Sequence, residues 1–137
     1  MISTSNTKAD IELPSRLDSM LRVEAMIDDI GVTIGASEEV RANMQVAVGE
    51  AVKNAIEFGN QSDASKSVLL SVEKKEGEVI FVVKDAGTGF DFNKVADPTS
   101  PENIEKITGR GIFLMRNLAD KVEYADGGSK VTIAFKI

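Results

Sequence analysis

The feature that most constrains the fold is the order in which the hydrophobic periodicity changes. From residue 14 to residue 58 apolar side chains recur at helical spacing, and from residue 68 onward most of them alternate as in strands. Short polar turns at Glu76-Gly77 and Asp126-Gly127-Gly128 join strand-like runs, which is typical of hairpins. Helices followed by hairpins predict an α+β fold, a two-layer α/β sandwich with a mostly antiparallel mixed sheet and helices on one face.

We expect the following elements in chain order: a strand at 11–13, helices at 14–31 and 37–58, strands at 68–72 and 79–83, a helix at 112–119, and strands at 122–124 and 131–137. Pro14 suits the first turn of a helix, and Gly31 is a plausible C-terminal stop. Ser37 is a good N-cap. Residues 91–108 carry two prolines and little periodicity, so we expect a long loop of the kind that often serves as a lid.

Length and composition favour one domain. The chain has 137 residues, of which 42% are apolar, enough for one sizeable core and too few for two. We expect a flexible N-terminus over residues 1–10 and a single domain over residues 11–137. No run approaches the ~18 apolar residues of a membrane span, and the N-terminus lacks the order of a signal peptide. The expected location is therefore cytoplasmic, with no membrane partner.

The charged and reactive side chains restrict the possible chemistry. The sequence contains no cysteine and no histidine, so thiolate nucleophiles, cysteine zinc sites and the commonest general base are excluded. With 22 acidic and 16 basic residues the net charge is −6, which disfavours a nucleic-acid partner and leaves proteins or small ligands. An acidic chain that binds a polyanion needs a local correction, such as a metal ion or a helix N-terminus.

The helix expected at 37–58 has two adjoining stripes. On a helical wheel its apolar residues form one stripe that should pack on the sheet: Val40, Met44, Val48, Ala51, Ala55 and Phe58. Glu50, Asn54 and Glu57 follow at i, i+4 and i+7 on a stripe beside it. This second stripe is either a solvated face or the lining of a crevice. In a crevice, the amide oxygen of Asn54 would suit Mg²⁺, and Glu50 could accept a proton from a nucleophile.

Two glycine-rich segments follow. DAGTGFD, residues 85–91, comes after the strand expected at 79–83, and its two glycines allow close approach of a ligand. Asp85 could there accept a hydrogen bond from an exocyclic amine such as that of adenine, although a plain turn would explain the pattern as well. The second segment, TGRGIFL, residues 108–114, opens the last helix. Glycines at a helix N-terminus expose amide N–H groups to an anion, and Arg110 adds a positive charge.

The three segments in this order resemble the N, G1 and G2 boxes of the Bergerat-fold (GHKL) ATPase and kinase superfamily. Within it the chain looks most like the serine-protein-kinase anti-sigma factors of the RsbW and SpoIIAB type. The resemblance covers nearly the whole chain and includes GEAVKNAIEFGN, VKDAGTGFD, GRGIFLMRNLADKVEY and GGSKVTIAF. One departure is visible, because the family often has histidine where this chain has Phe58.

The resemblance implies a role for each box. Glu50 would be the general base, Asn54 the Mg²⁺ ligand, and Asp85 the contact to the adenine amine. The other expected nucleotide-binding residues lie in the glycine-rich boxes: Gly87, Gly89, Phe90, Gly109, Arg110, Gly111, Ile112 and Phe113. ATP and Mg²⁺ would be the cofactors. The implied partners are a sigma factor and a small STAS-type anti-sigma-factor antagonist that is phosphorylated on serine or threonine, and a homodimer is expected.

Alternatives to this kinase remain open. The chain could be a non-catalytic module that binds ATP and sequesters a protein partner. It could also be the catalytic piece of a histidine kinase, although it contains no histidine to accept phosphate. Finally, the boxes could be coincidental in a plain α+β domain.

Overall fold

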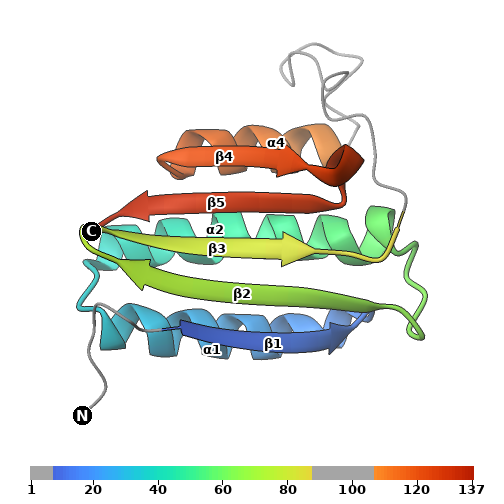
Figure 1. The fold of residues 1–137 in the computed structure, drawn as a ribbon, viewed down its shortest axis with the longest axis horizontal. Helices are drawn as coiled ribbons and strands as arrows, with labels where there is room; N and C mark the ends of the chain where they lie inside the picture. Colours follow the sequence, from blue (N-terminus) through green and yellow to red (C-terminus); the bar gives the residue numbers. More distant parts are fainter. Residues whose placement is uncertain (1–7, 88–106) are drawn as a thin grey trace.

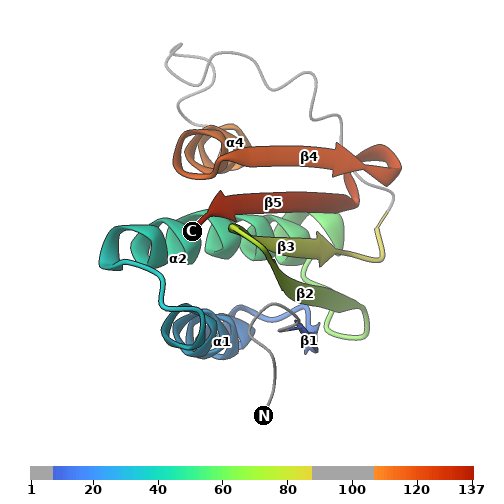
Figure 2. The same cartoon turned by 60° about the vertical axis from the view of Figure 1, so that its left-hand side comes forward.

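The computed structural model describes residues 8–87 and 107–137, with the backbone alone for 107–111. Its five strands form one sheet in the order β1-β2-β3-β5-β4, and all three α-helices lie on one face of it (Figures 1 and 2). The strands are β1 (Lys8–Pro14), β2 (Ser67–Lys75), β3 (Glu78–Lys84), β4 (Lys121–Ala125) and β5 (Lys130–Lys136). The expected α+β sandwich with helices on one face is confirmed.

The helical layer consists of α1 (Met20–Thr33), α2 (Glu38–Asn54) and α4 (Ile107–Leu118). The axis of α2 continues as a π-helical turn, η3 (Ala55–Gly59), and short 3-10 turns lie at η2 (Leu17–Ser19) and η5 (Asp126–Gly128). As predicted, Ser37 caps α2, since its Oγ accepts a hydrogen bond of 3.2 Å from the amide of Val40. Among the described residues, no helix is long and apolar enough to cross a membrane.

Every strand pairing among the described residues is antiparallel, so the parallel pair of a mixed sheet does not occur there. Alternate side chains of the three central strands point into the core: Val68, Leu70 and Val72, then Val79, Phe81 and Val83, then Val131, Ile133 and Phe135. The rings of Phe81 and Phe135 meet edge to face, with centroids 6.0 Å apart. Both predicted hairpins are present, and Val122 and Tyr124 lie opposite Ile133 and Val131.

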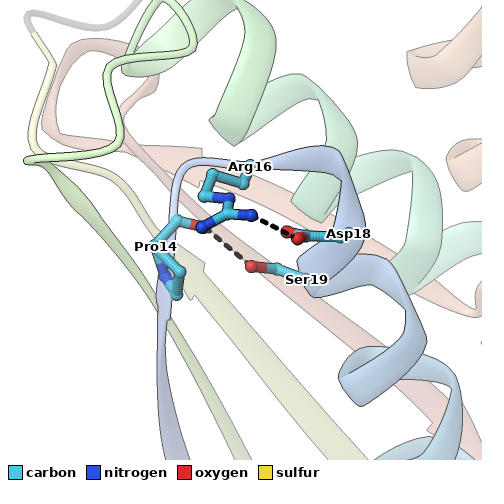
Figure 3. Close-up of polar contacts among 4 residues, drawn as sticks. All are labelled: Pro14, Arg16, Asp18 and Ser19. Carbon is cyan, nitrogen blue, oxygen red and sulfur yellow. Dashed lines mark hydrogen bonds and ion pairs between the residues drawn. The ribbon is translucent and has the colours of Figure 1, made fainter.

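The first helix does not begin where the sequence suggested. Pro14 completes β1 opposite Ser67, and α1 starts only at Met20. The corner between them is held by a hydrogen bond of 2.9 Å from Ser19 Oγ to the Pro14 carbonyl, beside an exposed ion pair of Arg16 with Asp18 (Figure 3). Pro14 is therefore a strand terminus, because it pairs with Ser67 in the sheet, and its carbonyl accepts the hydrogen bond that closes this corner.

Three further expectations are corrected. Gly31 does not end α1, which runs to Thr33; a Cβ at Gly31 would come within 2.6 Å of Arg41 Cδ, so this glycine allows α1 and α2 to pack closely. Residues 8–10 belong to β1, so a flexible terminus as far as Asp10 is wrong for them, and residues 1–7 lie outside the described residues. Of the loop expected at 91–108, residues 107 and 108 are helical and the rest lie outside the described residues.

The apolar stripe expected on residues 37–58 is largely correct. Met44, Val48, Ala51 and Ala55 are buried, and Val40 packs at the edge of the core. Phe58 is instead 40% exposed and Ile56 is fully buried. The reason is η3, since a π-helical turn has i→i+5 hydrogen bonds and rotates the residues after Asn54 away from the positions of an ideal wheel.

Candidate functional site

The predicted site residues of the helix lie at the C-terminal end of α2. Asn54 is 4% exposed, and neither Oδ1 nor Nδ2 of its side chain has a hydrogen-bond partner among the residues that the structure describes. Leaving such buried groups unpaired costs about 1–3 kcal/mol. Glu50 lies one turn earlier and is half-buried, as is Glu57. The second stripe is therefore no ordinary solvated face, because the side-chain amide of Asn54 is buried and lacks hydrogen-bond partners among the described residues.

Asp85 follows β3 and is 8% exposed. Its amide donates to the Ser129 carbonyl (2.9 Å), and its Oδ1 accepts from the Gly87 amide (2.8 Å). Burial raises the pKa of the Asp85 carboxyl, while the hydrogen bond from Gly87 acts in the opposite direction. The carboxylate thus has one internal donor and capacity to accept further hydrogen bonds.

Asn54 and Asp85 line one narrow cavity between α2 and the sheet. It measures about 10 Å³, and the remaining lining residues come from α2, η3, β3, β4, η5 and β5: Ala51, Ala55, Val83, Tyr124, Gly128, Ser129 and Val131. That volume is close to what one water needs. Burial raises the pKa of the Tyr124 hydroxyl, so it stays protonated at neutral pH. The cavity brings together two predicted site residues that are 31 positions apart in the sequence.

Two glycines make this packing possible. A Cβ at Gly59 would overlap the Asp85 carboxylate, and a Cβ at Gly87 would overlap the Gly59 carbonyl. Neither glycine has a positive φ, so absence of a side chain is what the site requires. We expect Gly87 to allow close approach of a ligand, and this stays a prediction; the structure shows that Gly87 also allows close approach of η3.

Asn60 is a residue of the site region that sequence reasoning missed. It is fully buried directly after η3, and its side chain bonds to three separate segments, at Ser15, Ser67 and Ala86. In the sequence it is only a polar residue after a glycine, a typical helix end. The one available signal was that Asn60 directly follows the N box in the sequence. No local sequence pattern distinguishes a buried asparagine from a solvated one.

The second glycine-rich segment forms the first turns of α4, which begins at Ile107 and not at residue 112. Gly109, Arg110 and Gly111 are therefore the third to fifth residues of the helix, and only the first four helical amides lack carbonyl partners. The start of α4 lies at the same end of the molecule as η3 and the end of β3 (right-hand side of Figure 1). The Ile112 side chain is buried in the core, and that of Phe113 is 45% exposed. Gly89 and Phe90 lie outside the described residues.

The cavity itself has room for about one water, but the donors and acceptors around it have the chemistry to bind a nucleotide with a hard metal ion. Asn54 offers an amide oxygen without a partner, Asp85 offers carboxylate oxygens to an amine, and the start of α4 offers amide donors. Among the described residues, no three His, Cys, Asp and Glu side chains are grouped to hold a metal. A Mg²⁺ ion here would thus depend on Asn54 together with phosphate oxygens and water.

A five-stranded antiparallel sheet with its helices on one face, and with a buried Asn and Asp at the helix–sheet junction, defines a two-layer α+β sandwich domain. The sequence model of the histidine kinase-like ATPase domain matches residues 13–135. The chain therefore belongs to the histidine kinase-like ATPase domain family.

Two curated relatives carry more specific names. The serine-protein kinase RsbW of Listeria innocua is 25% identical, over 96% of this chain and 88% of the relative. The anti-sigma F factor of Clostridium perfringens is 31% identical, over 84% of this chain and 83% of the relative. A crystal structure of RsbU and RsbW domains from Mycobacterium tuberculosis matches with a TM-score of 0.64 at 18% identity. It shares the fold with 95% of this chain, which spans about a third (32%) of that longer chain.

Proposed function

We propose that the protein is an ATP-binding serine/threonine protein kinase that acts as an anti-sigma factor or a related partner-switching regulator. Its substrate would be a small STAS-type anti-sigma-factor antagonist. The relatives named a serine-protein kinase and an anti-sigma F factor support this function. The main support is the side-chain amide of Asn54, which is buried, has no hydrogen-bond partner among the described residues and lines the same cavity as Asp85. A bound ligand would supply the hydrogen-bond or metal partners that this amide lacks.

The nucleotide would be held at three points. Asp85 would accept a hydrogen bond from the adenine amine, and the Asn54 oxygen would ligate Mg²⁺. The first turn of α4, which includes Gly109 and Arg110, would donate amide hydrogen bonds to the phosphates, and Gly111, Ile112 and Phe113 would complete the phosphate site. Gly87 and Gly89 would let the backbone close around the base and ribose, and Phe90 would also contribute to nucleotide binding. When bound, Mg²⁺ would supply charge neutralisation on the phosphates.

Glu50 would serve as the general base. It lies one helical turn from Asn54 on the same stripe of α2 and is half-buried, so it can contact both solvent and a docked peptide. Its carboxylate would accept the proton of the attacking serine or threonine hydroxyl. Phosphoryl transfer depends mainly on positioning and charge stabilisation, so a single carboxylate base is sufficient and no histidine is needed.

The proposed partners follow from the same assignment. The protein would bind and block a sigma factor. Phosphorylation would release the antagonist and so leave the sigma factor sequestered. We propose a cytoplasmic homodimer for the working form. The acidic balance of the chain, 22 acidic against 16 basic residues, supports protein partners over nucleic acid.

The first test is calorimetric titration of the purified chain with ATP, with Mg²⁺ and then with EDTA. We expect binding that depends on Mg²⁺, and an Asn54→Ala variant that loses this dependence. Equal ATP binding by the wild type and Asn54→Ala would contradict the metal assignment. Absence of ATP binding under either condition would contradict the proposed function and favour a module that binds protein partners alone.

The second test follows transfer of the γ-phosphate to purified STAS-type antagonist proteins. Glu50→Gln should keep ATP affinity and lose transfer by about 100-fold or more, the usual range for a general base. Glu57→Gln is the matched control, since Glu57 is also half-buried but lies in η3, after Asn54. Wild-type ATP binding without any transfer would favour the non-catalytic sequestering module.

A further inference from the structure

Asn60 joins three segments that are distant in sequence. Its Nδ2 donates to Ser15 Oγ (2.8 Å) and to the Ser67 carbonyl (3.1 Å), and its Oδ1 accepts from the Ala86 amide (2.8 Å). The side chain is fully buried. Both N–H groups and the carbonyl oxygen are therefore used, and the end of β1, the start of β2 and the turn after β3 are fixed to one amide.

The surroundings determine which way this amide points. The Ser67 carbonyl can only accept, and the Ala86 amide can only donate, so the NH₂ group must face Ser67 and the oxygen must face Ala86. Ser15 agrees with this orientation, because its hydroxyl proton is donated to the Lys66 carbonyl (2.7 Å) and its oxygen is left to accept. A residue with a different arrangement of hydrogen-bond donors and acceptors cannot satisfy all three partners.

The bond to Ala86 acts on the turn that carries Asp85. The Ala86 amide belongs to the peptide that directly follows Asp85, and the next amide, of Gly87, donates to the Asp85 carboxylate. Gly59, which precedes Asn60, leaves no space for a Cβ between itself and that carboxylate. Asn60 therefore fixes the backbone directly after Asp85, and Gly59 packs against the Asp85 carboxylate.

The backbone after Asn60 is strained in a way that fits this role. Gln61 and Ser62 have φ values of 52° and 57°, which is unusual for residues other than glycine. Hydrogen bonds from the Ser62 amide to the Ile56 carbonyl (2.7 Å) and from the Asp63 amide to the Asn60 carbonyl (3.0 Å) keep the turn closed. Strain of this kind persists where surrounding structure overdetermines it, often beside functional sites.

We propose that Asn60 is a positioning residue that sets the Asp85 carboxylate for recognition of the adenine amine; this rests on the proposed ATP site. Asn54 and Asn60 thus differ in role. The side-chain amide of Asn54 would bind a ligand. The side-chain amide of Asn60 would hold the Asp85 carboxylate in the position where it accepts a hydrogen bond from adenine.

The test compares ATP with purine riboside 5′-triphosphate, which lacks the exocyclic amine. Hydrogen bonds to charged groups typically contribute enough that the wild type should prefer ATP by about 10- to 100-fold. Asp85→Ala should abolish the preference. Asn60→Ala should reduce it to about twofold by weakening ATP binding, with little change in affinity for the purine analogue. A purely structural role would lower both affinities together.

Ser15→Ala and Ser19→Ala complete the set. Ser15→Ala removes one partner of the Asn60 amide and should lower the preference by a smaller factor, which keeps the test usable if Asn60→Ala does not fold. Ser19→Ala is the matched control, because it deletes a comparable buried hydrogen bond, to the Pro14 carbonyl, without touching the turn at Asp85 (Figure 3). It should keep the full preference for ATP.

Each outcome decides the proposal. A wild-type preference that Asp85→Ala abolishes but Asn60→Ala and Ser15→Ala retain would overturn the role of Asn60 and leave the proposed function standing. A wild type that binds both triphosphates equally would overturn the adenine contact of Asp85 and the role of Asn60 with it. A wild type that binds neither would overturn the proposed function itself.

Discussion

The two ends of the sheet use glycine for different reasons. At the end that holds the α1–α2 loop and the β2–β3 turn, Gly35 and Gly77 have φ values of 69° and 77°, and a Cβ at either would meet no atom within 4 Å. The end that holds Asn54 and Asp85 also has glycines of positive φ, Gly127 and Gly128 in η5. Gly59 and Gly87 at that end have ordinary backbone angles, but a Cβ at either would overlap neighbouring atoms. The first end needs only backbone freedom, and the second end also needs space.

This difference shows where precise packing is concentrated. Turns at the first end can form from local preferences, because positive φ is a property of one residue. At the second end, η3, the turn after β3 and η5 must be brought together before either glycine has a function. We therefore expect substitutions at the second end to have larger effects and to change the ligand site as well as stability.

The largest expected effect comes from Gly87→Ala. Its methyl would overlap the Gly59 carbonyl, and backbone cannot move aside as a flexible side chain can. We expect the free energy of unfolding to fall by about 3 kcal/mol, at the upper end of overpacking costs, with loss of ATP binding. Urea denaturation and calorimetry measure the two effects. Unchanged ATP affinity would mean that the contact of η3 with the turn after β3 is not needed for the site.

Gly77→Ala tests the other end and has a smaller expected effect. The open surroundings leave only the cost of a positive φ, about 1 kcal/mol for alanine. ATP affinity should not change, since Gly77 lies in the turn between β2 and β3 at the opposite end of the sheet from Asp85. A loss as large as that of Gly87→Ala in the same urea experiment would remove the distinction between the two ends.

Sequence reasoning succeeded where structure depends on local patterns. Alternation in β2 and β3 predicted the first hairpin, and Ser37 predicted the start of α2. It failed where contacts between residues that are distant in the sequence determine the structure. Pro14 ends a strand because it pairs with Ser67, and Gly31 lies inside a helix because Arg41 packs on it.

The site shows the same limit. The spacing of Glu50 and Asn54 placed them on one stripe, and the burial of Asn54 in the structure matches the crevice interpretation. The role of Asn60 could not be predicted, since its partners Ser15 and Ala86 are 45 and 26 residues away. A helical wheel also could not place Phe58, because the π-helical turn changes the period at that point.

Burial of the Asp85 carboxyl should make the free energy of unfolding depend on pH. We expect this effect to be smaller still than that of Gly77→Ala. A raised pKa means that the folded chain keeps this proton to higher pH than the unfolded chain does. Stability is therefore lost as pH rises from the unfolded pKa to the folded pKa, and the loss remains at neutral pH. Asp85→Asn should remove this component, so the difference in unfolding free energy between variant and wild type should shift in favour of the variant as pH rises from 3 to 7. A difference that is constant with pH would contradict it.

Asn54→Ala should change the stability of the nucleotide-free protein least of all. Its side-chain oxygen and nitrogen make no hydrogen bond within residues 8–87 and 107–137, so truncation removes an unsatisfied group and offsets the small loss of packing. The difference should appear only with ligand: Mg²⁺·ATP at 100 times its Kd stabilises a binding protein by about 2.7 kcal/mol, and Asn54→Ala should lose most of that gain. Thermal unfolding with and without Mg²⁺·ATP measures both. A nucleotide-free variant destabilised as much as Gly77→Ala would show that the amide serves the fold, whereas equal stability with lost ligand stabilisation would place it at the ligand.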